Sequence, residues 1–440
     1  MEWQFTPLAS CLLVAGSLVL LFAPRRYALG ALILVAVFVP MSNRVIVSSI
    51  DLMTHRLLVL VGLVRLCFRQ EARGLSLHTI DKVLIALTLW SIFAYSTLWG
   101  TLSGFIYQVG RSFDMIGLYF LFRVFLRSPE DWVAAAKALG VGCVIFAGFM
   151  LVESATGKNL LAALGAMSEE VGGRRGRLRC QASFGHAISA GVFGASLVPL
   201  WLAAWNQEQL RKWAVLGLVT STFMTVTSAS SSSLLTYVAG LAAFFFWPAR
   251  HHLRLIRWGV LFLLSGLHLV MQAPVWALLQ RINVVGGSTG NYRYRLFDRF
   301  VHSFDQWWLL GLKSPEEAFG MWDLCNQFVL EGVRGGLLRL ALFVALLALC
   351  FREVGRVMAN LEDRRQAIWI WALGAMLFAH TAAFWGYDYW DQIRVLLYLL
   401  FAVIASASKV CSSGHEGVNL EMDAIEPHLP PDPAYTFQYK

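Results

Sequence analysis

The stretch FGHAISAGVFGASLVPLWLAAW, residues 184–205, decides the fold class of this chain. His186 is its one charged or titratable residue, and a membrane-spanning helix needs roughly 20 mostly apolar residues. The full chain of 440 residues continues the pattern, because it is 58% hydrophobic and 14% charged, with a mean hydropathy of +0.60. Soluble domains are about half apolar and a quarter charged. We therefore expect an all-α polytopic membrane protein.

Thirteen apolar segments predict helices along the chain. They cover residues 8–23, 27–41, 55–68, 80–101, 109–126, 132–153, 184–205, 211–228, 232–248, 256–273, 333–350, 366–386 and 392–408. Because the third segment is short, the sequence predicts about 12–13 transmembrane helices in one domain, residues 1–408. The acidic, Pro-containing tail, residues 409–440, is expected to be disordered.

Short basic loops such as PRRY (24–27) and RHHLRLIR (250–257) lie an even number of predicted crossings apart. The positive-inside rule then places these loops and the tail in the cytoplasm and the N-terminus outside. The acidic turn GYDYWDQ (386–392) falls outside, as that rule expects.

Two predicted external loops, residues 154–183 and 274–332, break the rule because they are rich in arginine. The first contains Arg174, Arg175, Arg177 and Arg179, and the second contains Arg293, Arg295 and Arg299. Arginine suits phosphate because its planar fork donates paired, charge-assisted hydrogen bonds. An anionic ligand at the outer surface explains the exception, although lipid headgroups or a neighbouring acid such as Asp298 would also pair with these side chains. Scattered arginines do not indicate nucleic acid.

The second loop contains an amphipathic run, YRYRLFDRFVHSFDQWWLLG (292–311). Its apolar residues follow a helical spacing. We expect one helix along the membrane face, with Trp307 and Trp308 at the interface.

Four segments, in order, resemble the O-antigen ligase and O-antigen polymerase superfamily, and its exopolysaccharide polymerase branch in particular. They are RCQASFGHAISAG (179–191), SASSSSLL (228–235), GGSTGNYRYRLFDRFVHSFDQWWLLG (286–311) and WDLCNQFVLEGVRGGLL (322–338). Ala182, Ser183 and Ala187 depart from the Gly, Pro and Pro that the family favours. Cys325 precedes Asn326 where ligases of the superfamily have a histidine, which favours a polymerase.

The resemblance implies a metal-independent glycosyltransferase without a cofactor, in the bacterial inner membrane with its site facing the periplasm. Its substrate would be an oligosaccharide on undecaprenyl pyrophosphate, and a flippase and a chain-length regulator of the same pathway would be its partners. Two alternatives stay open. One is a ligase that transfers the glycan to another acceptor, and the other is a flippase or transporter, although no internal repeat of the transporter kind is evident.

The resemblance also suggests roles for individual residues. Arg179, with Arg293 or Arg295, would bind the pyrophosphate, and Arg293 fits the family position. Asp323 is the candidate general base, although an Asp at this place also suits a helix N-cap. Glu331 is a second candidate base, or a partner of Arg334.

Four further features have both a functional and a structural interpretation. His186 would hydrogen-bond the substrate or serve the structure alone. Asn326 and the serines at 230–233 would bind sugar hydroxyls or allow close helix packing, and for the serines we favour packing. Trp308, with Trp307 and Trp322, would stack on sugars or anchor the protein at the interface. Cys180 and Cys325 lie in the two external loops, where a disulfide is conceivable.

Overall fold

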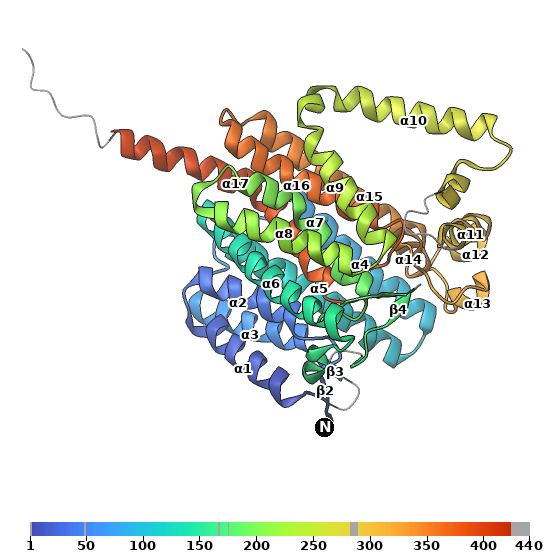
Figure 1. Cartoon of the computed structure of the whole chain (residues 1–440), viewed down its shortest axis with the longest axis horizontal. Coiled ribbons are helices and arrows are strands. Elements are labelled where there is room, and N and C mark those ends of the chain that lie inside the picture. The colour runs from blue at the N-terminus through green and yellow to red at the C-terminus, as the bar shows by residue number, and fades with distance from the viewer. Residues whose placement is uncertain (1, 48–49, 166–167, 175, 282–288, 424–440) are drawn as a thin grey trace, which may run out of the picture.

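The computed structural model describes residues 2–47, 50–165, 168–174, 176–281 and 289–423, and it is a bundle of helices (Figure 1). The α-helices are α1 (Pro7–Phe22), α2 (Arg25–Phe38), α3 (Thr54–Arg69), α4 (Thr79–Trp99), α5 (Leu102–Phe125), α6 (Pro129–Thr156), α7 (Ala187–Ala204), α8 (Arg211–Thr227), α9 (Ser231–Phe245), α10 (Leu253–Val270), α11 (Thr289–His302), α12 (Phe304–Trp307), α13 (Pro315–Phe319), α14 (Gln327–Val333), α15 (Gly336–Ala359), α16 (Arg364–Ala383) and α17 (Ile393–Asp423). Short 3-10 helices are η1 (Leu160–Leu164), η2 (Glu208–Leu210), η3 (Trp247–His252) and η4 (Val275–Arg281).

The strands are few and short. β1 (Glu2–Trp3), β2 (Arg44–Val47) and β3 (Ile50–Met53) form an antiparallel sheet with β2 in the centre, and β4 (Gly173–Arg174) pairs with β5 (Arg177–Leu178). In the larger sheet Arg44 lies opposite Met53 and Val45 opposite Leu52. None of these strands was predicted, because each is too short to show a periodic pattern.

Each of the thirteen predicted segments contains a helix. Among the described residues, six helices are long and apolar enough to cross a membrane: Thr79–Trp99, Pro129–Thr156, Ala187–Ala204, Trp247–Val270, Arg364–Ala383 and Ile393–Cys411. The helices Pro7–Phe22 and Ser231–Phe245 are apolar but shorter. The prediction of a helical polytopic membrane protein is therefore confirmed, and crossings beyond these six stay a prediction.

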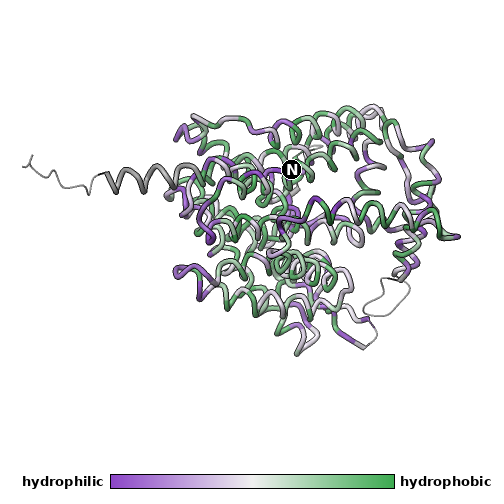
Figure 2. The backbone as a smooth tube through the Cα atoms, turned by 90° about the horizontal axis from the view of Figure 1, so that it is seen from above, coloured by the Kyte–Doolittle hydropathy of each residue, from purple (hydrophilic) through white to green (hydrophobic). Residues whose placement is uncertain are grey.

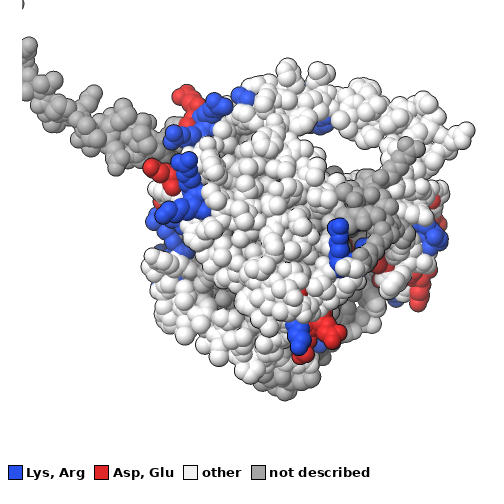
Figure 3. Space-filling view, in the orientation of Figure 1, with Lys and Arg blue, Asp and Glu red and all other residues white. Residues whose placement is uncertain are grey.

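The distribution of polar residues fits a membrane protein. Figure 2 shows that the tube is mainly hydrophobic along the helices and more hydrophilic near their ends. On the face in Figure 3, charged side chains gather toward the left and toward the right and lower right, with a broad uncharged area between them. That uncharged area has the character expected of a surface in contact with lipid.

Helix α7 is the centre of the bundle, and it packs against α8, α9 and α16. All of its residues are buried except Ile188 and Leu202. Small residues allow this close packing, because a Cβ at Gly191 would lie 2.2 Å from Ser228 Oγ. Trp201 fills the space beside α8 and donates from Nε1 to Ser221 Oγ at 2.9 Å. The apolar stretch that indicated the fold class is thus the most enclosed helix of the bundle.

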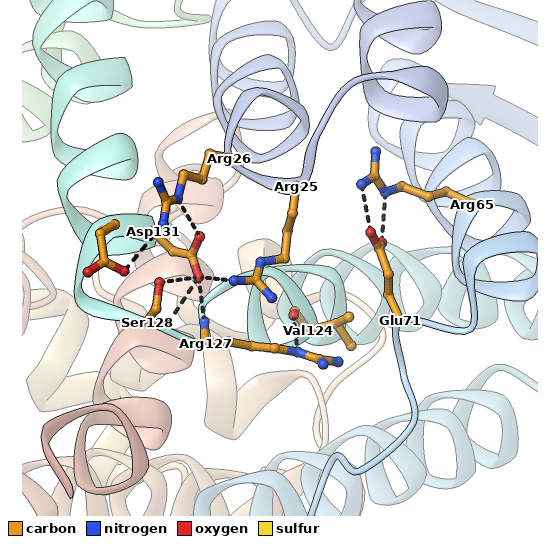
Figure 4. A network of polar contacts seen from close by, with 9 residues as sticks. Arg25, Arg26, Arg65, Glu71, Val124, Arg127, Ser128 and Asp131 are labelled. Atoms are coloured by element: carbon orange, nitrogen blue, oxygen red, sulfur yellow. Dashed lines mark hydrogen bonds and ion pairs between the residues drawn. The ribbon is translucent and has the colours of Figure 1, made fainter. Parts of the chain in front are cut away.

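The helix ends on the predicted cytoplasmic side are joined by ion pairs (Figure 4). Asp131 is buried at the start of α6 and accepts hydrogen bonds from Arg25 at 2.8 Å and from the backbone amides of Arg127 and Ser128 at 3.0 Å. Arg65 donates to both carboxylate oxygens of Glu71 at 2.7 Å. Arg25 and Arg26, which belong to the basic loop PRRY, therefore also fasten the start of α2 to the start of α6.

The described residues of the long segment, 274–281 and 289–332, include a small apolar core. Leu296, Phe300, Trp307, Phe319 and Val329 are among the buried residues that pack together there. The prediction of one continuous helix over 292–311 was wrong, because α11 ends at His302 and α12 begins at Phe304. Trp307 is buried rather than interfacial, since it stacks on Phe300 with ring centroids 4.1 Å apart.

Two glycines hold this segment against the start of α15. Gly311 and Gly336 have φ of +96° and +71°, in the left-handed region that favours glycine. A Cβ on Gly311 would lie 2.1 Å from Val333 O, and one on Gly336 would lie 2.2 Å from Leu309 O. The predicted helix 333–350 therefore starts at Gly336, after a break that the glycines require.

The last helix is longer than predicted. α17 continues to Asp423, past Lys409, where we expected a disordered tail to begin. Residues 424–440 of the predicted tail lie outside the described residues.

Candidate active site

Arg179 follows the β4–β5 hairpin and is half-buried before the turn into α7. Its backbone N–H donates to Gly172 O at 2.8 Å. The Nε and Nη2 atoms of its guanidinium are buried and have no hydrogen-bond partner among the described residues. Burial lowers the pKa of Arg179, and the charge of Arg174 lowers it further. An unpaired buried cation is costly, so this side chain is suited to an anionic ligand.

The turn after Arg179 is held by Glu153, near the end of α6. Its carboxylate accepts hydrogen bonds from the backbone amides of Gln181 and Ala182, at 2.7 and 2.8 Å. Ala182 has a φ of +52°. This left-handed conformation is one that glycine adopts without steric cost.

His186 is the N-cap of α7, and its Nδ1 accepts from the backbone N–H of Ile188 at 3.1 Å. Its ring lies parallel to that of Tyr387, with centroids 6.4 Å apart. Burial, and then the charge of Arg179, lower the pKa of His186 to about 4. The ring is therefore neutral at pH 7. It is a structural cap that stands within electrostatic range of Arg179, and its Nδ1 is already engaged.

Arg293 is buried against two segments distant in sequence. Its Nη2 donates to Ser232 Oγ at 2.7 Å and to Gly386 O at 3.2 Å, and Ser232 Oγ donates to Gly386 O at 3.1 Å. Burial lowers the pKa of Arg293, although Cys325 and Asp323 raise it and Arg174 lowers it. The alternative, a pairing with Asp298, is not among the ion pairs of the described residues, and Asp298 accepts from Trp276 Nε1 at 2.9 Å.

The structure distinguishes the two candidate arginines of α11. Residues two positions apart lie on nearly opposite faces of a helix, so Arg293 is turned into the protein and Arg295 is exposed. Arg174 lies within electrostatic range of both Arg179 and Arg293. Arg174, which the sequence placed among the loop arginines without a role of its own, therefore links Arg179 and Arg293 electrostatically, whereas Arg295 is exposed.

Asp323 lies beside this basic group. Tyr292 fixes its backbone, donating to Asp323 O at 2.8 Å and accepting from Asp323 N at 2.9 Å. Asp323 is exposed, but partial desolvation by the surrounding protein raises the pKa of its carboxyl above the usual value. The charge of Arg293 opposes this shift without cancelling it. Asp323 is not an N-cap, which leaves its carboxylate available to a ligand.

A second carboxylate, Asp388, stands in the turn between α16 and α17. Burial, and then the charge of Asp323, raise the pKa of Asp388 to about 6. Two carboxylates that interact in this way are a common arrangement for proton transfer. In the sequence, Asp388 served only to orient the chain, and the signal that was available was an acidic turn without Lys or Arg.

Two predicted residues have structural roles. Asn326 caps α14, and its Oδ1 accepts from the amides of Phe328 at 2.9 Å and Val329 at 3.2 Å. Glu331 is buried and pairs with Arg339 at 2.6 Å rather than with Arg334. The alternative of a Glu331–Arg334 pair is therefore not realised, and the ion pair with Arg339 makes Glu331 less suited than Asp323 to be the base.

The serines and cysteines at the site also differ in role. Ser233 packs against α7, with Oγ 3.4 Å from Ile188 O, as favoured, whereas Ser232 binds Arg293. Cys180 and Cys325 are free thiols, so the conceivable disulfide is not formed. Burial raises the pKa of Cys325 to about 12, so this residue is a neutral neighbour of Arg293. The side chains of Trp308 and Trp322 are exposed, and their roles stay predictions.

Comparison with known proteins adds no family to this geometry. No protein-family model matches the chain, and a search of the curated proteins finds no match.

Proposed function

We propose that this chain is a membrane glycosyltransferase that polymerises repeat units linked to undecaprenyl pyrophosphate. Arg179 and Arg293 bind the pyrophosphate of the donor, and Asp323 accepts the proton of the attacking hydroxyl. The protein lies in the bacterial inner membrane with this site at the periplasmic face. It works with the flippase that delivers its substrate and with a chain-length regulator.

The unpaired guanidinium of Arg179 is the observation that carries the proposal. Its Nε and Nη2 atoms are buried without a partner among the described residues, and Arg174 and His186 lie within electrostatic range. Arg293, which interacts electrostatically with Arg174, adds a second buried guanidinium. Two oxygens of a phosphate group would satisfy the free Arg179 donors with charge-assisted hydrogen bonds.

The arrangement supports the following reaction. The acceptor hydroxyl attacks the anomeric carbon of the donor sugar, a new carbon–oxygen bond forms, and the bond to the phosphate oxygen breaks. The proton of the hydroxyl passes to Asp323, whose carboxylate interacts with Asp388. The leaving pyrophosphate gains negative charge in the transition state, where fixed cationic donors lower the barrier most.

The test uses purified protein in lipid nanodiscs with a synthetic undecaprenyl-pyrophosphate repeat unit, and it reads product length on a gel. We expect a ladder from wild type. Loss of one preorganised donor costs roughly 10²–10³ in rate, so Arg179→Gln and Arg293→Gln should lower the rate by about this factor, and Asp323→Asn should also abolish the ladder.

Arg295→Gln is the matched control, because Arg295 lies on the same helix two residues from Arg293 but is exposed. It should retain the wild-type rate. Transfer that appears only with a different, non-repeat acceptor would identify a ligase instead. Absence of transfer with either acceptor, or equal rates in the Arg293 and Arg295 variants, would refute the proposed site.

A further inference from the structure

A second group of arginines lines a cavity next to the proposed site. The cavity has a volume of about 630 Å³, and Ser183 and Gly185, which precede His186, form part of its wall. Arg111 on α5 and Arg394 at the start of α17 also line it. Arg334, at the break between α14 and α15, lies within electrostatic range of Arg111. Ligand sites of small molecules commonly occupy about 300–1,000 Å³.

Arg111 and Arg394 are not neutralised by ion pairs among the described residues. Nη1 of Arg111 donates to the Tyr107 hydroxyl at 3.1 Å, and Nη2 of Arg394 donates to Trp390 O at 2.7 Å. Nη1 of Arg334 is buried and has no hydrogen-bond partner in the part of the chain that the structure describes. Glu331 interacts with Arg111 and Arg334 electrostatically but is hydrogen-bonded to Arg339.

The remaining charges of the cavity are largely paired. Arg44 pairs with Asp51 at 3.4 Å, and Arg56 pairs with Asp114 at 3.1 Å. Asp391, the third carboxylate in the wall, accepts from the backbone N–H of Ile393 at 3.2 Å and interacts electrostatically with Arg394. The lining therefore has four arginines and three aspartates, an excess of one positive charge, and Arg111 and Arg394 are its two arginines without an ion pair among the described residues.

Aromatic side chains lie beside these cations. Tyr107 and Trp390 line the cavity and are 45% and 37% exposed. Tyr95 extends the aromatic surface, since its ring lies 5.7 Å from that of Tyr107 and 5.6 Å from that of Trp99. Apolar and aromatic walls with a few fixed polar groups are typical of sites for organic ligands, and here those groups are cationic.

We propose that this cavity holds the second substrate by an anionic group, which Arg111 and Arg394 bind. The group is a carboxylate of an acidic sugar or the pyrophosphate of the acceptor lipid. The inference rests on the proposed function, because a polymerase must hold two lipid-linked chains at once. It assigns one arginine group to the donor and the other to the acceptor.

Equilibrium binding to the full chain in nanodiscs tests this without turnover. The probes are trigalacturonic acid, the neutral trisaccharide of galactose, and inorganic pyrophosphate. We expect wild type to bind at least one anionic probe, and Arg111→Gln and Arg394→Gln each to weaken that binding at least tenfold, which corresponds to about 1.4 kcal/mol. Arg44→Gln is the matched control, because Arg44 lines the same cavity but is paired with Asp51; it should bind within threefold of wild type.

The pattern of loss identifies the ligand. Binding of the acidic trisaccharide that depends on Arg111 indicates an acidic sugar, and Arg111-dependent binding of pyrophosphate indicates the acceptor lipid. Pyrophosphate binding that depends on Arg293 alone belongs to the donor site. If, in addition, the binding of no probe depends on Arg111, the proposal is overturned. Equal affinity for acidic and neutral trisaccharides, with pyrophosphate binding unchanged in both variants, also overturns it.

A conservative variant tests for misfolding, and a comparison of binding with ladder formation separates failure of the anion site from failure of the proposed function. Arg111→Lys keeps the charge and should retain most of the binding, which distinguishes a local charge effect from misfolding. If wild type binds the anionic probe through Arg111 but makes no ladder, the proposed function fails and the anion site stands. If wild type makes a ladder but binds no anionic probe through Arg111, the proposed function stands and the anion site is overturned.

Discussion

Replacing Glu331 with Gln tests whether this residue is structural, as its contacts indicate, or the catalytic base. Glu331 is 5% exposed and accepts from Arg339 Nε at 2.6 Å and from Gln327 Nε2 at 2.6 Å. Gln327 in turn accepts from the backbone N–H of Tyr389 at 2.7 Å, next to Asp388. The carboxylate thus links α15 to the turn that positions Asp388.

The expected loss of stability follows from the buried cation that remains. Arg339 is 9% exposed, and Arg111 and Arg334 lie within electrostatic range of Glu331. Removing one partner of a buried ion pair costs about 3–5 kcal/mol, whereas replacing both partners with apolar residues is often close to neutral. Glu331→Gln should therefore lower the free energy of unfolding by about 3–5 kcal/mol, and Glu331→Leu combined with Arg339→Leu should recover most of it.

Thermal unfolding in micelles, followed by tryptophan fluorescence, gives the order of stability of the variants. The expected order of Tm is wild type, then the double variant, then Glu331→Gln. A Glu331→Gln protein as stable as wild type would refute the structural role. A variant with unchanged Tm and no transfer activity would instead support Glu331 as the base.

Three further predictions concern the site and its supports. The raised pKa of Asp388, about 6, predicts that transfer activity falls as pH decreases through 6, because the carboxylate becomes protonated; in Asp388→Asn this acid limb should disappear or move to lower pH in the pH–rate profile. Ala182→Gly should raise the free energy of unfolding by about 1 kcal/mol, because glycine adopts the φ of +52° without steric cost, and a lower Tm would contradict this. Gly336→Ala should lower the Tm, because its Cβ would lie 2.2 Å from Leu309 O at a φ of +71°, and an unchanged Tm would show that the segment adjusts without cost.

Much of the fold could be predicted because membrane helices are encoded locally. An apolar run long enough to span a bilayer must satisfy its backbone hydrogen bonds internally, and a helix does so without help from distant residues. This is why all thirteen predicted segments contain helices. The breaks between helices could not be predicted in the same way. The break between α14 and α15, at Arg334, depends on the close approach of Gly336 to Leu309, which is distant in the sequence.

The site was predictable only in part. The sequence indicated Arg179, Arg293 and Asp323 through three of the four motifs, and in the structure Arg174 interacts electrostatically with both arginines and Arg293 interacts with Asp323. It could not show that Asn326 rather than Asp323 caps α14, because both residue types suit an N-cap and the helix start decides between them. Asp388 was missed because its importance arises from its proximity to Asp323, 65 positions away in the chain.

The sequence by itself determined that the chain is helical and membrane-embedded, and it indicated that two predicted external loops concentrate arginine. These properties follow from the hydrophobicity and charge of consecutive residues, which can be read directly from the sequence. Only the tertiary structure decided that Arg293 is buried on Ser232 while Arg295 is exposed, and that Glu331 is neutralised by Arg339. The physical reason is that the burial and pairing of a side chain depend on residues from other helices. A local sequence pattern does not predict which of those residues will lie beside it.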